Sequence, residues 1–173
     1  MDNFAVTRVW VAVSLVGSPV AMTALCLLTV AVLLTQRRRI MAVGAIVAQG
    51  GGGVINEVLK QTIQRPRPPG AQTYLYGNSW SFPSGHAMGS LIGFGFLCYV
   101  VVVCWSNTRN TRHWAIAVAS TMILAIGISR LAIGVHYISD VLGGWSIGAV
   151  WLAVCIVVLQ RVARGEHHHR ATA

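Results

Sequence analysis

Residues 85–105 read GHAMGSLIGFGFLCYVVVVCW, a stretch of 21 residues without any Asp, Glu, Lys or Arg. About 20 consecutive apolar residues in a helix cross the hydrocarbon core of a bilayer, so this stretch predicts a transmembrane helix. Four more apolar segments flank it in the chain, at residues 9–34, 40–63, 114–133 and 141–159. The sequence therefore predicts an all-α bundle of about five membrane-spanning helices.

The composition also indicates a membrane protein. Of the 173 residues, 55% are hydrophobic and 10% are charged, whereas soluble domains carry about 25% charged residues. Five spans occupy most of the chain, so we expect one domain over residues 1–173. The first apolar segment is too long for a cleaved signal peptide, and we expect it to remain as a span.

The basic residues divide into two groups. Arg residues gather in the connections 36–39 and 106–113 and in the tail 161–173, which five alternating spans place on one side of the membrane. The positive-inside rule makes that side cytoplasmic, and it places the N-terminus outside a multi-pass protein of the inner (plasma) membrane. Apart from Arg8, the remaining cations then lie near the outer face: Lys60, Arg65, Arg67 and Arg130.

Charge and cysteine usage exclude other classes. The net charge of +9 does not indicate nucleic-acid binding, because the basic residues lie between apolar segments with few aromatic residues among them. The cysteines lack C-x-x-C spacing and lie inside apolar segments, so we interpret them as small buried hydrophobic residues rather than disulfide partners or metal ligands: Cys26, Cys98, Cys104 and Cys155. The oligomeric state is not indicated by any pattern.

The cations near the outer face predict an anion site. Lys60, Arg67 and Arg130 are suited to phosphate, since Arg binds it through two parallel hydrogen bonds and Lys supplies a compact charge. Lys60 and Arg65 have an alternative, because long basic side chains near a membrane boundary commonly reach to lipid headgroups. Arg130 lies deep within an apolar segment, where an ionisable residue is a functional candidate.

The sequence Pro83-Ser84-Gly85-His86 predicts a turn that opens a helix. Ser84 is suited to cap the helix, and Gly85 allows close approach to the free N–H groups, which bind anions at helix N-termini. His86 taken alone is also compatible with an ordinary interfacial histidine.

His136 and Asp140 are four residues apart, a spacing that brings them onto one face if the segment is helical. A carboxylate that holds one imidazole nitrogen orients the other as a nucleophile. Asp140 begins an apolar span, so an unpaired charge there would be unfavourable and a partner such as His136 is expected. Glu57 is expected to pair with Lys60 or Arg65 rather than to catalyse.

Three motifs resemble those of the type 2 phosphatidic acid phosphatase family, whose core is shared with vanadium haloperoxidases. A Lys followed after six positions by Arg-Pro is matched by Lys60 and Arg67-Pro68. Pro-Ser-Gly-His is matched by residues 83–86. The pattern Ser-Arg, five residues, His, three residues and Asp is matched by Ser129, Arg130, His136 and Asp140. The motifs are complete and in order, and the resemblance covers about residues 40–160.

The resemblance implies a bacterial lipid phosphatase that uses no metal or other cofactor. His136 would attack phosphorus to form a phosphohistidine, Asp140 would orient it, and His86 would protonate the leaving oxygen and later activate water. The phosphate-binding residues would be Lys60, Arg67, Ser84, Gly85 and Arg130. Candidate substrates are undecaprenyl diphosphate, which we place first, phosphatidylglycerol phosphate and phosphatidic acid. Bacterial members often have six spans, one more than predicted here.

Three alternative functions use the same residues. A lipid or anion transporter would bind its substrate with these cations and catalyse nothing. A zinc hydrolase would use His86, His136 and Asp140 as ligands, which leaves the three cations unexplained. A haloperoxidase would hold vanadate in the same pocket, but the resemblance associates that chemistry with larger soluble proteins.

Two local features have structural interpretations. The glycines at residues 50–53 are expected to let helices approach closely, with a mobile hinge as the alternative. Tyr74, Tyr76 and Trp80 are expected at the level of the lipid headgroups, with a direct grip on the lipid as the alternative.

Overall fold

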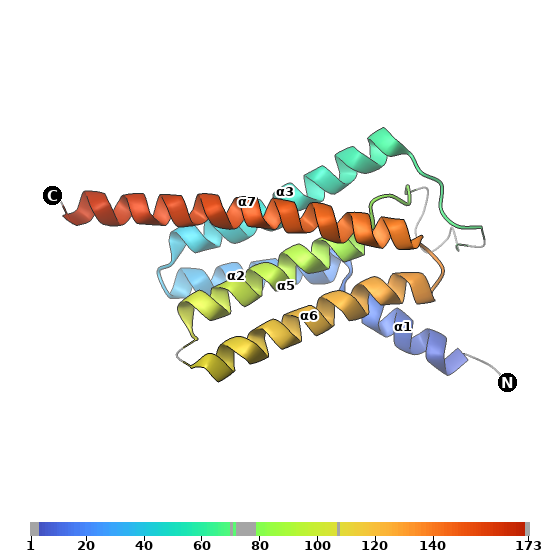
Figure 1. Ribbon diagram of the computed structural model, residues 1–173, viewed down its shortest axis with the longest axis horizontal. Coiled ribbons are helices and arrows are strands. Elements are labelled where there is room, and N and C mark those ends of the chain that lie inside the picture. Colours follow the sequence, from blue (N-terminus) through green and yellow to red (C-terminus); the bar gives the residue numbers. More distant parts are fainter. Residues whose placement is uncertain (1–3, 70, 72–78, 107, 172–173) are drawn as a thin grey trace.

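The computed structural model describes residues 4–69, 71, 79–106 and 108–171. Within this part the chain is all-α and contains no strand. The helices run side by side along one long axis (Figure 1) and are α1 (Phe4–Val16), α2 (Pro19–Thr35), α3 (Arg39–Ile63), α5 (Gly85–Cys104), α6 (Arg109–Ala132) and α7 (Ile138–Ala171).

Five segments of the described chain are long and apolar enough to cross a membrane. They correspond to the five predicted spans, and the protein is a multi-pass membrane protein. The boundaries of α3 and α5 lie within one residue of those predicted. The helix α6 begins at Arg109, five residues before the predicted span, because Thr108 caps it by accepting a hydrogen bond from the Thr111 N–H at 3.2 Å.

The first predicted span is not one helix. Gly17 and Ser18 separate α1 from α2, although the whole region is apolar enough to count as a single span. Ser18 caps α2, because its Oγ accepts a hydrogen bond from the Ala21 N–H at 3.2 Å, and Pro19 starts the helix. A proline has no N–H to donate and disfavours helical backbone in the residue before it, so the helix restarts here.

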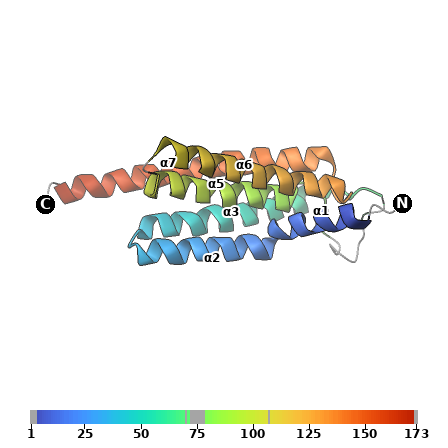
Figure 2. The same cartoon turned by 90° about the horizontal axis from the view of Figure 1, so that it is seen from below.

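The break gives the two helices different neighbours. Whereas α2 packs on α3 and α5, α1 packs mainly on α6, and the two helices follow each other with an offset (Figure 2). Gly17 permits the contact with α6, since a Cβ there would lie 2.2 Å from Cγ2 of Ile126. The N-terminal helix is thereby held against the α6 segment that leads to Arg130.

The last helix extends well beyond its predicted span. It contains 34 residues and continues through most of the predicted basic tail, which corresponds to a length of about 51 Å at 1.5 Å per residue. The hydropathy pattern marks only the apolar part of such a helix, because a charged surface face does not end it.

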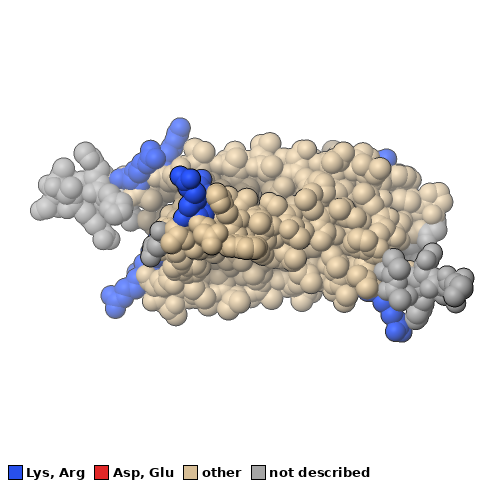
Figure 3. Space-filling view, turned by 60° about the horizontal axis from the view of Figure 1, so that its bottom comes forward, with Lys and Arg blue, Asp and Glu red and all other residues tan. Residues whose placement is uncertain are grey.

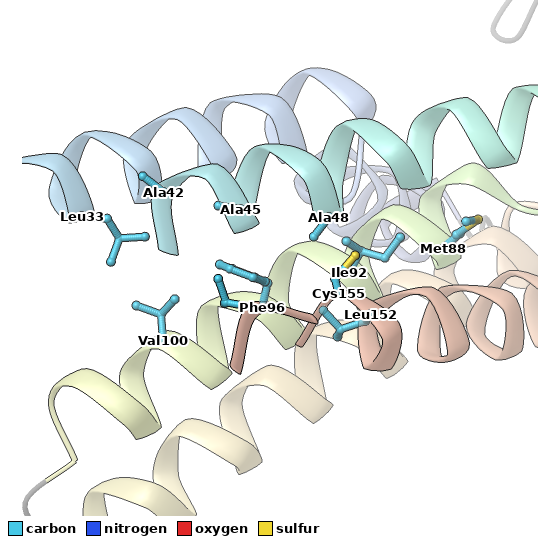
Figure 4. Packing of buried hydrophobic residues seen from close by; sticks show 11 residues of the cluster. Leu33, Ala42, Ala45, Ala48, Met88, Ile92, Phe96, Val100, Leu152 and Cys155 are labelled. Carbon is cyan, nitrogen blue, oxygen red and sulfur yellow. The ribbon is translucent and has the colours of Figure 1, made fainter. Parts of the chain in front are cut away.

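The core lies between α2, α3, α5 and α7. Small residues on α3 face larger ones on α5 and α7 (Figure 4) in the cluster Leu33, Ala42, Ala45, Ala48, Met88, Ile92, Phe96, Val100, Leu152, Cys155 and Leu159. The indole N–H of Trp151 donates to the Ala48 carbonyl at 2.9 Å.

The four consecutive glycines divide into two pairs. A Cβ on Gly51 would lie 2.4 Å from Trp151, and one on Gly52 would lie 2.4 Å from Ile92, so these two glycines allow close packing as predicted. By contrast, a Cβ on Gly50 or Gly53 would meet no atom within 4 Å. The helix α3 is continuous through all four.

The connections fall at opposite ends of the bundle. The links α3–α5 and α6–α7 lie at the end that also holds the N-terminus, and the links α2–α3 and α5–α6 lie at the end toward the C-terminus (Figure 1). Lys and Arg side chains gather at both ends of the face in Figure 3 and leave its middle uncharged. An uncharged middle between charged ends is the expected surface of a protein that crosses a bilayer.

Candidate active site

Residues from all three polar motifs line one cavity of about 930 Å³. The predicted site residues on its wall are Lys60, Arg67, Gly85, His86, Arg130 and His136. They come from the end of α3, the segment after it, the start of α5, the end of α6 and the turn that follows. The fold therefore brings together three cations and two imidazoles that are far apart in the sequence.

His136 lies in the turn between α6 and α7, not in a helix. The chain leaves α6 through Gly134, whose φ of +77° is accessible to glycine at little cost. The Val135 N–H donates to the Arg130 carbonyl at 3.2 Å and closes the turn. The predicted pairing of His136 with Asp140 is thus confirmed, but a turn rather than a helical face creates it.

The pair is buried and its contacts are specific. His136 Nδ1 lies 3.4 Å from Asp140 Oδ2, with side-chain exposures of 2% and 0%. Asp140 is in the first turn of α7, and its Oδ2 also accepts a hydrogen bond from the Tyr137 N–H at 2.9 Å. A carboxylate in this position caps the helix and is favoured by the helix dipole.

The surroundings of His136 determine its tautomer. Nη1 of Arg67 lies 3.4 Å from His136 Nε2, and a guanidinium group can only donate hydrogen bonds. Nε2 therefore presents its lone pair, and Nδ1 carries the hydrogen that faces Asp140. In this form the Nε2 lone pair could serve as a nucleophile, and His136 lines the cavity.

Burial lowers the pKa of His136 below its usual value of 6.5. The nearby Arg67 and Arg130 charges lower the pKa further, whereas the hydrogen bond to Asp140 opposes them. The low pKa keeps the imidazole neutral, as a nucleophile requires.

Hydrogen bonds orient the three cations. Lys60 Nζ donates to Ser79 Oγ at 2.9 Å. Arg67 Nε donates to the Ser79 carbonyl at 2.9 Å, and its Nη1 donates to the Val135 carbonyl at 3.0 Å. Arg130 has an exposed fraction of only 1%, and its Nη1 donates to Ser14 Oγ on α1. The positive charges are therefore held in place before an anion binds.

Ser84 and Gly85 begin α5 beside the cavity. Ser84 is buried and does not line the cavity; its Oγ accepts from the Ala87 N–H at 3.5 Å, and its own N–H donates to the Asp140 carbonyl at 3.0 Å. Gly85 lines the cavity, and a Cβ there would lie 3.1 Å from Asn56 Oδ1. Ser84 thus caps the helix whose first residue, Gly85, lines the cavity.

The partners of Glu57 and Arg65 differ from those predicted from the sequence. Glu57 forms no ion pair with Lys60 or Arg65 in the described structure; its Oε1 accepts a hydrogen bond from Gln61 at 2.7 Å. Arg65 instead pairs with Asp140. The spacing did not reveal this pair, because the two residues are 75 positions apart.

Three serines that contact the site residues lie outside the three sequence motifs. Ser14, Ser79 and Ser81 contact Arg130, Lys60 and Asp140 through side-chain hydroxyls. Serine is too common for a single one to stand out without its partner. Trp80 is half-buried, while Tyr74 and Tyr76 lie outside the described residues.

All four cysteines are free, but the prediction that they are buried holds fully only for Cys155, because Cys26, Cys98 and Cys104 are half-buried. Across the described chain, no group of three His, Cys, Asp or Glu side chains is close enough to hold a metal ion. His86, His136 and Asp140, the ligands of the zinc alternative, are therefore not gathered as such a group.

Among curated proteins, this chain is similar in sequence to phosphatases. The chain is 35% identical over 99 residues to phosphatidylglycerophosphatase B of Bacillus subtilis, which covers 57% of this chain and 48% of that protein. It is 26% identical over 130 residues to lipid phosphate phosphatase 2 of Arabidopsis thaliana, covering 60% of this chain and 45% of that protein. The chain thus spans about half the length of the curated relatives it matches.

Solved structures share the fold. The transmembrane PAP2-type phosphatidylglycerolphosphate phosphatase from Bacillus subtilis superposes with a TM-score of 0.83 at 25% identity, over 91% of this chain and 78% of that one. LpxE from Aquifex aeolicus superposes with a TM-score of 0.61 at 20% identity, over 88% of this chain and 86% of that one. Residues 40–164, which include all three motifs, match the PAP2 superfamily. The chain belongs to the PAP2 superfamily, as its resemblance to type 2 phosphatidic acid phosphatases predicted.

Proposed function

We propose that this protein is a membrane lipid phosphatase that hydrolyses a lipid phosphate through a phosphohistidine on His136. The observation that carries the proposal is the lining of the cavity, in which the cations and imidazoles share one wall with a set of mainly apolar residues, here called the groove. The groove is lined by residues from α1, α2 and α3, among them Leu15, Met22, Leu27, Ile46, Gly50 and Gly53.

The groove opens on the side of the bundle. Leu15, Leu27 and Ile46 line the cavity and also have exposed side chains, with exposed fractions of 64%, 61% and 52%. In a membrane these side chains face hydrocarbon, so a lipid can enter from the bilayer with its phosphate toward Arg67 and its chain along α3. A water-soluble phosphate ester has no apolar chain that could bind along such a groove.

The first step transfers the phosphoryl group to the protein. His136 Nε2 attacks phosphorus, the bond from phosphorus to the lipid oxygen breaks, and His86 gives its proton to that oxygen. Lys60, Arg67, Arg130 and the Gly85 N–H stabilise the equatorial oxygens, on which phosphoryl transfer spreads negative charge. Asp140 stabilises the cationic phosphoimidazole through Nδ1–H.

The second step restores the protein. His86, now neutral, takes a proton from water as the water oxygen attacks phosphorus and the bond to Nε2 breaks. Inorganic phosphate leaves, His136 is again neutral, and His86 is again protonated. Covalent catalysis divides one difficult step into two, and general acid–base help contributes about 10²- to 10⁴-fold. No metal takes part in either step.

Phosphatidylglycerol phosphate replaces undecaprenyl diphosphate, which the sequence resemblance alone placed first, as our first candidate substrate. The support is the similarity to phosphatidylglycerophosphatase B of Bacillus subtilis and to the solved structure of a phosphatidylglycerolphosphate phosphatase from the same organism. Undecaprenyl diphosphate and phosphatidic acid present the same phosphate chemistry to the cations and remain the other candidates. Phosphate release from a panel of these lipids in liposomes ranks them.

Binding of the lipid chain in the groove can be tested with a variant whose added side chain fills part of the groove. Gly53 has open space around it and lines the cavity, so Gly53→Leu places a side chain where the lipid chain would lie. Displacing two methylenes at about 0.8 kcal/mol each corresponds to about a tenfold loss of kcat/KM for a long-chain substrate. A short-chain, water-soluble analogue keeps its rate within about twofold.

Gly165→Leu is the matched control, because Gly165 also has open space but lies on α7 away from the cavity. Equal losses on both substrates in Gly53→Leu would contradict the groove assignment. Binding of every lipid in the panel by the wild-type protein without phosphate release would favour the transporter instead.

We further propose that the site faces the outside of the inner membrane. The support is the Arg-rich connections 36–39 and 108–112 at the opposite end of the bundle. Ser79→Cys beside the site should react with a membrane-impermeant maleimide in spheroplasts, whereas Asn110→Cys at the other end should react only after lysis. The reverse pattern would overturn the orientation.

A further inference from the structure

We propose that Arg65 and Ser81 are positioning residues that hold the Asp140 carboxylate in the orientation His136 needs. The inference rests on the proposed phosphatase reaction and adds to it. Neither residue belongs to the three motifs, and neither lines the cavity. They contact Asp140, which does not line the cavity either.

Arg65 contacts one oxygen of the carboxylate. Its Nη1 donates to Asp140 Oδ1 at 2.8 Å and to Ser139 Oγ at 2.6 Å. The guanidinium carbon also lies 4.2 Å from the centre of the Tyr137 ring. Arg65 is thus held by contacts with Tyr137, just before α7, and with Ser139 and Asp140 in its first turn.

Ser81 contacts the other oxygen. Its hydroxyl donates to Asp140 Oδ2, and its Oγ lies 3.4 Å from His136 Nδ1. The Ser81 N–H donates to the Arg65 carbonyl at 2.8 Å, so the two residues are also joined through the backbone. The first and last parts of the α3–α5 connection therefore act on Asp140 together.

The two oxygens of the Asp140 carboxylate therefore bind different partners. Oδ1 is occupied by Arg65, which leaves Oδ2 for Ser81, the Tyr137 N–H and His136. Asp140 is fully buried, and a buried carboxylate without partners is strongly unfavourable. Without Arg65, the carboxylate is free to turn toward other donors and lose its alignment with Nδ1.

Arg65 and Arg67 therefore have different roles despite their separation of two residues. Arg67 lines the cavity and faces His136 Nε2 at 3.4 Å, where substrate phosphate would lie. Arg65 acts on the opposite nitrogen of the ring through Asp140. A substitution at Arg67 should raise KM, whereas a substitution at Arg65 should lower kcat and leave KM nearly unchanged.

The first test compares Arg65→Gln with Arg65→Lys in the full-length protein. A misplacement near 1 Å of a catalytic group can reduce rates by roughly 10²-fold, so we expect Arg65→Gln to lower kcat by about that factor. Arg65→Lys keeps the charge and should recover part of the loss. Removing a cation near the pair should also move the acidic limb of the pH–rate profile to higher pH.

The decisive test is a double-mutant cycle with Asp140→Asn. If Arg65 acts through Asp140, adding Arg65→Gln to Asp140→Asn should lower the residual kcat by no more than about threefold. Ser81→Ala should behave in the same way and removes only one hydroxyl. Losses that multiply in both double variants, or a rise in KM with unchanged kcat, would overturn the inference.

Arg8→Gln is the matched control, since Arg8 is an exposed Arg at the same end of the bundle. It should retain wild-type kcat and the wild-type pH profile. If Arg65→Gln does not fold, the cycle of Ser81→Ala with Asp140→Asn decides the question. A wild-type protein that releases no phosphate would refute the proposed function, whereas an active wild type with independent losses would refute only the positioning role.

Discussion

Nη1 of Arg67 lies 3.4 Å from Nε2 of His136, on the side of the ring that faces the cavity. The opposite nitrogen faces the carboxylate of Asp140. The imidazole thus lies between a group that binds anions and a group that is an anion. In the proposed reaction, this arrangement would direct Nε2 at a phosphate bound by Arg67.

His136→Ala should abolish turnover because the proposed reaction attacks phosphorus with Nε2 of His136, whereas His86 serves as the acid and base. We expect kcat to fall at least about 10⁴-fold, while the protein still extracts and elutes as the folded wild type does. His113→Ala is the control, because His113 is an exposed histidine on α6. A rate within tenfold of wild type for His136→Ala would disprove the nucleophile assignment.

The acidic limb of kcat/KM should lie below pH 6.5, the usual pKa of histidine. The pKa of His136 is lowered, mainly by burial, so the imidazole stays neutral and nucleophilic at mildly acidic pH. The same shift stabilises the fold above pH 6.5, and this contribution is lost as pH falls through the lowered pKa. Arg67→Gln removes a nearby positive charge and should move the limb to higher pH; an unchanged limb would contradict this account.

Treatment with EDTA should leave phosphate release unchanged, since the proposed steps use only side chains. Vanadate should inhibit the reaction, because a trigonal-bipyramidal vanadate on Nε2 resembles the transition state of phosphoryl transfer. Assays with and without the chelator at equal protein concentration provide the comparison. Loss of activity with EDTA that returns on adding Zn²⁺ would support the zinc hydrolase.

Ser14→Ala should weaken substrate binding from the other side of the bundle. Ser14 accepts a hydrogen bond from the buried Arg130, and bonds to charged groups contribute about 1.5–3 kcal/mol. We expect KM to rise about tenfold as Arg130 loses this orientation. The control is Ser120→Ala, an exposed serine on α6, and an equal effect in both variants would show that Ser14 has no special role.

Hydropathy and spacing predicted much of the architecture because they depend on local sequence. The ends of α3 and α5 follow from where apolar residues stop, and the pairing of His136 with Asp140 follows from their short separation. The break at Gly17 was missed because hydropathy does not change there, although Ser18-Pro19 is a typical helix start.

The sequence by itself determined a five-span helical bundle and a set of phosphate-binding and catalytic candidates, because apolar length and motif spacing are properties of neighbouring residues. Only the tertiary structure decided that Arg65 and Ser81 hold Asp140, across 75 and 59 positions, and that α1 brings Ser14 to Arg130 across 116. It also decided that Gly50 and Gly53 have open space beside the cavity, whereas Gly51 and Gly52 pack closely on Trp151 and Ile92. Such contacts arise from the packing of distant helices, which no local pattern records.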